Sequence, residues 1–348
     1  MGNFCYKINF VEKIKLLKCN YVLPIFNLFI YKFISIHQPV YYRMENSDYI
    51  REILKLKKEK KAVILAHNYQ RPEIQDIADF TGDSLGLSIE AVKTMADIII
   101  FCGVDFMAET AKILNPDKKV YIPEKAMCPM AMMLSPEEIL TTKEKFKSQN
   151  PSVVLYVNTH ASCKALSDYA CTSANVVKIL KSVTNDTIIF GPDANLADYA
   201  KKHINKNIIT IPRFGNCPTH HHISVNDVRN AKAQHPNAKF IAHPECIRDV
   251  REIADFVGST EQMIKFVKSS DNSEFIVGTE IGIIYRLRKE NPGKKFYPSS
   301  NAAICPNMKM TTLKSVYNAL KSERYEINMD KDIMNKARKS IERMIAVI

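Results

Sequence analysis

Three cysteines that are each followed by proline recur along this chain at an almost constant spacing. Cys128, Cys217 and Cys305 are the only cysteines with proline after them, and they lie 89 and 88 residues apart. Structural zinc is normally held by four ligands, whereas a [4Fe-4S] cluster held by three cysteines leaves one iron open to substrate. If the spacing reflects three equivalent domains, the three thiolates are candidates for one common metal centre.

Other landmarks recur with nearly the same period. An apolar run ends in a glycine that is followed two residues later by an acid, in the pairs Gly103 and Asp105, Gly191 and Asp193, and Gly278 and Glu280. Earlier in each copy an apolar run ends at a polar residue, and a small hydroxyl follows; these are His67 and Ser84, Asn158 and Ser173, and His243 and Thr260. Four landmarks in one order predict three duplicated units.

The elements expected in each unit alternate between strands and helices. In the first unit apolar runs cover 62–66, 97–101 and 119–122, and segments of helical spacing cover 72–80, 85–95 and 106–114. This alternation is typical of βαβ units and a parallel sheet covered on both faces. We predict an α/β fold with three homologous three-layer α/β/α domains around a pseudo-threefold axis. The expected boundaries are 44–135, 136–224 and 225–348, the last including C-terminal helices that pack on one of the domains.

The polar residues that end the first strand of each unit are expected to form a site. In open parallel sheets, ligands bind beyond the carboxyl ends of the strands, where helix N-termini converge. His67, Asn158 and His243 would lie there. An open iron beside His, Tyr and Glu side chains would act as a Lewis acid.

Several features also have a simpler structural interpretation. The hydroxyls at 84, 173 and 260 could equally be helix caps by spacing alone. Of the three adjacent histidines at 220–222, at most one can face a given ion, and His220 beside Cys217 is the one expected to support a ligand. The remaining cysteines are expected to be small buried apolar residues; they are Cys5, Cys19, Cys102, Cys163, Cys171 and Cys246.

The chain from about residue 44 to its end resembles the quinolinate synthase family, the A-type iron–sulfur enzymes of de novo NAD biosynthesis. The resemblance lies in the segments ILAHNYQRPEIQDIADFTGDSLGLS, FMAETAKILNP, KAMCPMA, YVNTHASCKALSDYACTSAN, GPDANLA, AHPEC, GSTEQM and NAAICPNMK. It implies an enzyme that condenses iminoaspartate with dihydroxyacetone phosphate to quinolinate, losing water and phosphate. It also implies one [4Fe-4S] cluster per chain, with Cys128, Cys217 and Cys305 as ligands.

The resemblance further implies roles for individual residues. His67, Tyr69 and Glu245 are the expected catalytic residues, with Tyr69 as proton-transfer partner of the triose. The expected substrate-binding residues are His67, Ser84, Tyr156, Asn158, Ser173, His243, Glu245 and Thr260. Acid and base groups of these types suit the isomerisation and dehydration of a hydroxyketone phosphate.

Charge and composition bear on the N-terminal segment, on nucleic-acid or membrane partners and on the location of the protein. The net charge of +12 includes six basic residues and one acid in residues 1–43, which we interpret as an extension, a targeting presequence or a start placed too far upstream. The rest carries no nucleic-acid-binding signature, and no apolar run is long enough to span a membrane. We expect a cytoplasmic enzyme, or an organellar one if the extension is a targeting segment. L-aspartate oxidase or aspartate dehydrogenase is the expected functional partner.

Two rival functions use the same cysteines. A non-catalytic iron–sulfur sensor would hold a labile cluster but would not need the acid and base groups of His67, Tyr69, Tyr156, Asn158 and Glu245. A radical enzyme that uses S-adenosylmethionine needs a clustered C-x₃-C-x₂-C segment, which this chain lacks.

Overall fold

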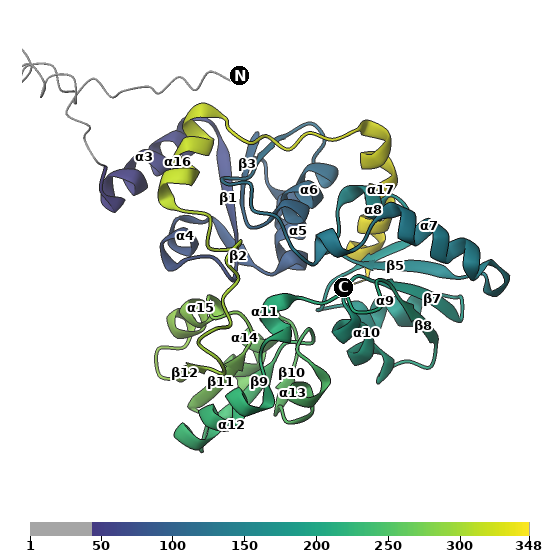
Figure 1. The fold of residues 1–348 in the computed structure, drawn as a ribbon. Helices are drawn as coiled ribbons and strands as arrows, with labels where there is room; N and C mark the ends of the chain where they lie inside the picture. Colours follow the sequence, from purple (N-terminus) through teal and green to yellow (C-terminus); the bar gives the residue numbers. More distant parts are fainter. Residues whose placement is uncertain (1–43, 348) are drawn as a thin grey trace, which may run out of the picture. The chain divides into compact units, whose positions relative to one another are not determined.

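The computed structural model describes residues 44–347, so the predicted extension at 1–43 lies outside the described residues. The described chain contains three four-stranded sheets, with strand orders β2-β1-β3-β4, β6-β5-β7-β8 and β10-β9-β11-β12 (Figure 1). Every strand pairing within these sheets is parallel. The predicted α/β fold built from three similar units is therefore confirmed, whereas the exact domain boundaries stay a prediction.

The first sheet lies between residues 62 and 121. Its elements are β1 (Ala62–His67), α4 (Pro72–Ile77), β2 (Phe80–Gly82), α5 (Ser84–Lys93), β3 (Ile98–Cys102), α6 (Asp105–Leu114) and β4 (Lys119–Tyr121), preceded by α3 (Asn46–Glu59). A 3-10 turn η1 (Ala131–Met133) follows the first Cys-Pro pair.

The second and third sheets repeat this order. The second contains α7 (Pro136–Lys145), η2 (Lys147–Gln149), β5 (Ser152–Tyr156), α8 (Ala161–Lys164), β6 (Tyr169–Cys171), α9 (Val176–Ser182), β7 (Thr187–Gly191), α10 (Ala194–Lys201), β8 (Asn207–Thr210) and α11 (Pro218–His221). The third contains α12 (Val225–Gln234), β9 (Lys239–Ala242), α13 (Arg248–Glu252), β10 (Phe256–Val257), α14 (Thr260–Ser269), β11 (Glu274–Gly278), α15 (Ile283–Glu290) and β12 (Lys295–Pro298).

Each sheet has one strand more than the sequence predicted. The edge strands β2, β6 and β10 are only two or three residues long and lie where we expected the end of a helix and a turn. Such short segments carry too few apolar residues to show the twofold alternation of a strand. Pairing with the neighbouring strand creates them, so local pattern could not reveal them.

The central strands are covered on both faces. In the first sheet, alternate residues of β1 and β3 face two separate apolar clusters. Leu65 and Ile99 belong to the cluster that includes α5 and α6, whereas Ile64 and Ile100 belong to the one formed with α3, α4 and α16. Uninterrupted apolar strands such as the fully buried β3 are typical of parallel sheets of this kind.

The two C-terminal helices pack on units other than the one that precedes them. Helix α16 (Leu313–Ser322) contributes Leu313 and Val316 to the cluster that holds Ile53 of α3. Helix α17 (Lys331–Ala346) lies against the second unit, where the Asn175 amide donates a hydrogen bond to the Met344 carbonyl. No helix among residues 44–347 is long and apolar enough to cross a membrane.

One carboxylate joins the second and third units. Asp198 of α10 accepts hydrogen bonds from both Arg248 and Arg251 of α13, with 2.6 Å between its Oδ2 and Arg251 Nη2. Arg251 is almost fully buried. Hydrogen bonding to Arg248, assisted by Arg251, lowers the pKa of Asp198 to about 2. The same two helices also share an exposed ion pair between Lys202, the residue after α10, and Glu252.

We predict that Asp198→Asn lowers the free energy of unfolding by about 2 kcal/mol at neutral pH, because it leaves the buried Arg251 guanidinium without its carboxylate. The native pKa of Asp198 lies below that of an aspartate in an unfolded chain. The carboxylate's contribution is therefore complete above about pH 5 and is lost as the pH falls towards 2. Urea unfolding between pH 7 and pH 3 would measure this, and the difference between wild type and variant should shrink at the acid end.

Glu252→Gln is the matched control on the same pair of helices. Its ion pair is exposed on both sides, so we expect little change at any pH. Equal destabilisation by the two substitutions would contradict a special role for the Asp198 contact.

Candidate functional site

Each Cys-Pro pair begins one helical turn. The carbonyls of Cys128, Cys217 and Cys305 accept hydrogen bonds from the backbone N–H four residues later, at 3.2, 2.9 and 3.3 Å. Proline suits the first position of such a turn because it has no N–H and its φ is already helical. The three cysteines therefore share one local conformation, as their periodic spacing suggested.

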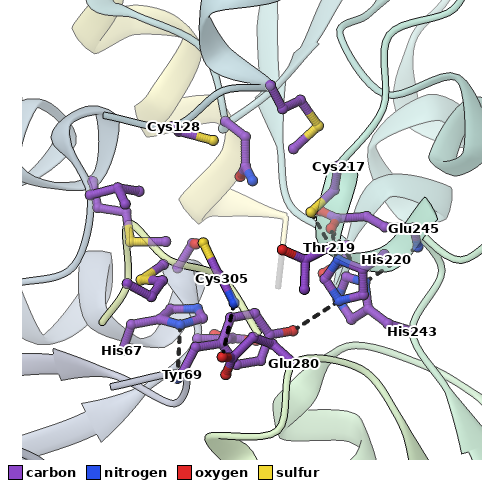
Figure 2. Close-up of a pocket in the computed structure, with 18 of the residues that line it drawn as sticks. His67, Tyr69, Cys128, Cys217, Thr219, His220, His243, Glu245, Glu280 and Cys305 are labelled. Atoms are coloured by element: carbon purple, nitrogen blue, oxygen red, sulfur yellow. Dashed lines mark hydrogen bonds and ion pairs between the residues drawn. The ribbon is translucent and has the colours of Figure 1, made fainter. Parts of the chain in front are cut away.

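All of the predicted site residues line one pocket. The three sulfur atoms face a common space, and the polar groups of all three units lie around it (Figure 2). The pocket contains His67, Tyr69, Ser84, Cys128, Tyr156, Asn158, Ser173, Cys217, His243, Glu245, Thr260 and Cys305. The structure thus brings together residues up to 238 positions apart in the chain, and the roles of these residues stay predictions.

The three predicted hydroxyls are not the caps of their helices. Asp83 is the N-cap of α5, and Ser259 is the N-cap of α14. Ser84 and Thr260 are therefore the first helical residues, and both line the pocket. The Asn68 amide donates a hydrogen bond of 2.8 Å to Thr260 Oγ1, which fixes this hydroxyl from the neighbouring unit. Two helix N-termini thus face the pocket, a favourable arrangement for anionic groups.

Two buried histidines are held as neutral rings. The backbone N–H of Tyr69 donates to His67 Nδ1 at 3.2 Å, and that of Glu245 donates to His243 Nδ1 at 3.3 Å. Each Nδ1 therefore acts as an acceptor, which assigns the ring hydrogen to Nε2. Burial lowers the pKa of His67 and of His243 to about 3. At neutral pH both rings are uncharged N–H donors.

A chain of hydrogen bonds runs through the pocket across all three units. The Tyr69 hydroxyl lies 2.6 Å from Thr279 Oγ1, which lies 2.7 Å from His220 Nε2. His220 Nδ1 is 2.7 Å from Glu245 Oε2, and Glu245 Oε1 accepts a hydrogen bond of 2.5 Å from the Tyr156 hydroxyl. The carboxylate beside Nδ1 assigns a hydrogen to that nitrogen and leaves Nε2 to accept from Thr279. This orientation is the one found in hydroxyl–histidine–carboxylate triads.

The groups of this hydrogen-bond chain differ in their charge at neutral pH. Burial alone would raise the pKa of Glu245, but its interaction with His220 and the hydrogen bond from Tyr156 outweigh burial and hold the pKa below its ordinary value. Burial, reinforced by Glu245, raises the pKa of Tyr69 and of Tyr156 well above that of a free phenol. At neutral pH the carboxylate is therefore charged and both phenols keep their protons.

The three cysteines of the Cys-Pro pairs pack against the main apolar cluster of the protein. Burial raises the pKa of Cys128 to about 12 and raises the pKa of Cys217 and Cys305 as well. The thiols are protonated at neutral pH, so binding a metal as thiolates must release protons. The apolar residues in this pocket are Val104, Phe106, Met107, Met130 and Met308.

A second set of donors shares one of these cysteines. The donor atoms of Cys217, His220 and Glu245 all lie within 4.8 Å of one another, and His220 Nδ1 is 3.0 Å from the Cys217 sulfur. The expected contact between His220 and Cys217 is thus present. Of the remaining cysteines, the four in the described part of the chain are buried and none lines the pocket, namely Cys102, Cys163, Cys171 and Cys246.

Comparison of the chain with known proteins gives one consistent result. The family profile described as quinolinate synthetase A protein matches residues 51–346. The chain is 52% identical to a quinolinate synthase of Thermodesulfovibrio yellowstonii over 301 residues, which are 86% of this chain and 98% of that protein. It is 52% identical to a quinolinate synthase of Pyrococcus horikoshii over 299 residues, again covering 86% and 98%. The chain belongs to the quinolinate synthetase A family.

Sequence reasoning did not single out Thr219, which lines the pocket of this quinolinate synthetase A family member, or Thr279, which contacts the pocket residues Tyr69 and His220. Thr279 lies between the glycine and the acid of the third unit, where the other two units have Val104 and Pro192. Thr219 follows the second Cys-Pro pair, where the first unit has Met130. A polar residue where the other two copies are apolar was the signal that could have identified Thr279. Thr219 gives no such signal, because the third unit has the polar Asn307 at the matching position.

One polar side-chain atom of the pocket has no hydrogen-bond partner among residues 44–347. Asn158 Oδ1 is buried and accepts no hydrogen bond, although Asn158 lines the pocket. A buried acceptor without a partner costs about 1–3 kcal/mol. Its position indicates a place where a ligand or an ordered water donates a hydrogen bond.

The neutral state of the two histidines can be tested by NMR. We predict that the ring signals of His67 and His243 in the cluster-free protein stay at neutral-imidazole positions from pH 8 to pH 5, because burial opposes their protonation. In the urea-unfolded chain the same residues should titrate at about 6.5. Since only the unfolded chain takes up these protons, the histidines should reduce stability progressively as the pH falls below about 6.5. A chemical-shift transition near pH 6.5 in the folded protein, lost in His67→Asn or His243→Asn, would contradict this assignment.

Proposed function

We propose that this protein is a quinolinate synthase, a condensing and dehydrating transferase of de novo NAD biosynthesis. It would join iminoaspartate and dihydroxyacetone phosphate into quinolinate with release of two molecules of water and one of phosphate, a balance that needs no oxidant or reductant. The observation that carries the proposal is the single pocket in which three equivalent cysteines meet an acid–base chain drawn from all three units.

The donor set fits one [4Fe-4S] cluster per chain. Cys128, Cys217 and Cys305 come from equivalent loops, face one space and are partly surrounded by apolar side chains. Among residues 44–347 no fourth cysteine lines the pocket, and a cluster bound by these three would keep one iron accessible. When bound, that iron would supply Lewis-acid chemistry towards the nitrogen and carboxylate of the substrate.

The remaining pocket residues suit two anionic substrates. The N-termini of α5 and α14, with the hydroxyls of Ser84 and Thr260, suit carboxylate or phosphate oxygens. His67 and His243 can donate from Nε2 without a charge of their own, and the Ser173 hydroxyl can bind a further oxygen. Asn158 Oδ1, which has no partner, would accept a hydrogen bond from a substrate donor such as a hydroxyl or an N–H.

Proton transfer would use the Tyr69–Thr279–His220–Glu245 chain. Tyr69, protonated at neutral pH, can donate its phenol proton at a substrate oxygen. Because Glu245 keeps the His220 hydrogen on Nδ1, His220 Nε2 can take up the Thr279 proton while Thr279 takes the Tyr69 proton, so that Tyr69 removes a proton from the substrate. The proton held on Nε2 then returns through Thr279 when Tyr69 donates its own proton to the substrate. Isomerising the triose and eliminating water need this alternation of acid and base.

Two alternatives predict different results. A non-catalytic iron–sulfur sensor would bind the cluster but form no quinolinate. A single metal ion held by Cys217, His220 and Glu245 would not need Cys128 or Cys305, and it would occupy the groups assigned here to proton transfer. The acid–base chain favours the enzyme over the sensor, since a sensor has no need of it.

We predict that the protein purified without oxygen contains about four iron and four sulfide per chain and forms quinolinate from dihydroxyacetone phosphate and enzymatically generated iminoaspartate. Cys128→Ser should lose the cluster and the activity, because it removes one of three thiolate ligands. Iron and sulfide analysis with a quinolinate assay would measure both.

Cys163→Ser is the matched control, since Cys163 is buried and its thiol donates to the Leu134 carbonyl outside the pocket. It should keep both cluster and activity. Bound metal without sulfide that survives Cys128→Ser would support the single-ion site instead. A full cluster without quinolinate would support the sensor.

We predict that Thr279→Val lowers kcat by about a hundredfold with little change in KM. It removes the short hydroxyl bridge between Tyr69 and His220, leaves only their direct contact of 3.4 Å, and removes no group that binds substrate. Thr279→Ser should recover most of kcat, since it restores the hydroxyl. Steady-state kinetics at constant cluster content would test this. An equal loss in both variants would show that the methyl group and packing matter rather than the hydroxyl.

The proposal includes a functional partner and a location. Iminoaspartate would come from L-aspartate oxidase or aspartate dehydrogenase, and the enzyme would act in the cytoplasm. Membership in the quinolinate synthetase A family supports the need for such a source of iminoaspartate.

A further inference from the structure

The acid that follows the central strand of each unit touches the cysteine loop of the same unit. The backbone N–H of Cys128 donates to Asp105 Oδ1 at 3.0 Å. The backbone N–H of Cys217 donates to Asp193 Oδ2 at 3.2 Å, and that of Cys305 donates to Glu280 Oε1 at 3.1 Å. The glycine-then-acid landmark of the sequence thus has a structural counterpart in all three units.

Each of these acids is also tied to the start of the segment that follows it. Asp105 Oδ1 accepts a second hydrogen bond of 2.8 Å from its neighbour's backbone N–H, at Phe106. Asp193 Oδ1 accepts one of 2.7 Å from Leu196 in α10. Glu280 Oε2 accepts one of 2.7 Å from Gly282. The carboxyl group therefore connects the end of the central strand, including the first turn of the helix after it, to the cysteine loop.

A second hydrogen bond strengthens this connection in every unit. The carbonyl two residues before each cysteine accepts a backbone N–H from the acid segment, at 2.8, 2.8 and 3.0 Å. The donors and acceptors are Asp105 to Ala126, Ala194 to Gly215, and Ile281 to Ala303. We call the carboxyl bond and this backbone bond together the clasp of each cysteine loop.

The clasp determines where each sulfur lies. Proline on one side removes an N–H and fixes φ, while the clasp holds the cysteine backbone on the other side. Because the cysteine N–H donates a hydrogen bond to a carboxyl group, the loop cannot turn towards solvent without breaking that bond. Six hydrogen bonds thus keep three thiols, from segments nearly ninety residues apart, facing the same space.

We propose that Asp105, Asp193 and Glu280 are positioning residues that preorganise the three cysteine loops for cluster binding, an inference that rests on the proposed function. They act through the cysteine backbone and need not touch the cluster. Residues that orient metal ligands in this way usually change metal affinity by about ten- to a hundredfold when substituted.

The three acids differ in a way that provides a sharp test. Asp105 accepts both of its hydrogen bonds on one oxygen, Oδ1, whereas Asp193 uses a different oxygen for each. An asparagine has a single acceptor oxygen. Asp105→Asn can therefore keep both bonds, whereas Asp193→Asn must lose one and place an NH₂ group against an N–H donor.

The first readout uses the cluster-free protein. Hydrogen exchange, followed by mass spectrometry of a peptide that contains Cys217, should be about tenfold faster in Asp193→Asn than in wild type. In Asp105→Asn the peptide that contains Cys128 should exchange within twofold of wild type, and in Asp105→Ala it should exchange faster. Because no cluster is involved, this readout stands even if the proposed function fails.

The second readout uses the reconstituted protein. Loss of iron to a chelator should be about ten- to a hundredfold faster in Asp193→Asn and Asp105→Ala than in wild type. Asp330→Asn is the matched control, because Asp330 accepts N–H groups at the start of α17 and touches no cysteine. Its iron loss should match wild type, and thermal unfolding would show that the variants compared are folded.

The outcomes separate the two proposals. Wild-type protein that holds no iron and sulfide would overturn the proposed function but not the clasp, which the exchange data judge alone. Unchanged exchange at the cysteine peptides together with unchanged iron loss would overturn the clasp. So would equal effects of Asp105→Asn and Asp193→Asn, since the hydrogen-bond geometry requires them to differ. If Asp193→Asn does not fold, Asp105→Ala against Asp105→Asn makes the same test.

Discussion

The pocket depends on one constraint, the purely parallel pairing of all three sheets. In a parallel sheet every strand ends at the same edge, so the residues that follow the strands gather there whatever their distance in sequence. His67 ends β1, His243 follows β9, and Gly103 and Gly278 lie at the ends of β3 and β11. Triplication of the unit places three such edges around one pocket.

The three units share their scaffold and differ in their chemistry. The clasped Cys-Pro turn is the same in all of them. The residue between glycine and acid differs, being Val104, Pro192 and Thr279. Repetition therefore produces three equivalent thiols, and divergence at matching positions produces the chain of unlike hydrogen-bonding groups to which we propose to assign proton transfer. An acid–base chain cannot be symmetric, because each member must differ in proton affinity from the next.

Features that occur in all three units could be predicted from the sequence, whereas features without a periodic pattern could not. The fold class and the three cysteines could be predicted because each was supported by three copies with one spacing. The edge strands β2, β6 and β10 could not, since a few residues hold no period of their own. The sequence also could not predict that α16 and α17 pack on units other than the third. Amphipathic spacing identifies the buried face of a helix but not the element that covers it.

Among the pocket residues too, some could be predicted from the sequence and others could not. Glu245 and Tyr69 could be predicted as catalytic residues by resemblance, but the contact of the Thr279 hydroxyl with Tyr69 and His220 joins different units. Contacts of this kind have no local signature. Comparing matching positions among the three copies, rather than inspecting each in isolation, would have identified Thr279 as the polar exception.

The hydrogen-bond chain proposed for proton transfer depends on how the three units pack together. Tyr69 belongs to the first unit, Thr279 and Glu245 to the third, and Tyr156 and His220 to the second. None of the three units therefore contains the chain alone. A shift between the second and third units would stretch the contacts of 2.7 Å and 2.5 Å at Glu245 before it disturbed any single core. The contact of Asp198 with Arg248 and Arg251 holds these same two units together. If this contact is lost, we expect the hydrogen bonds of Glu245 to be the first part of the pocket to be affected.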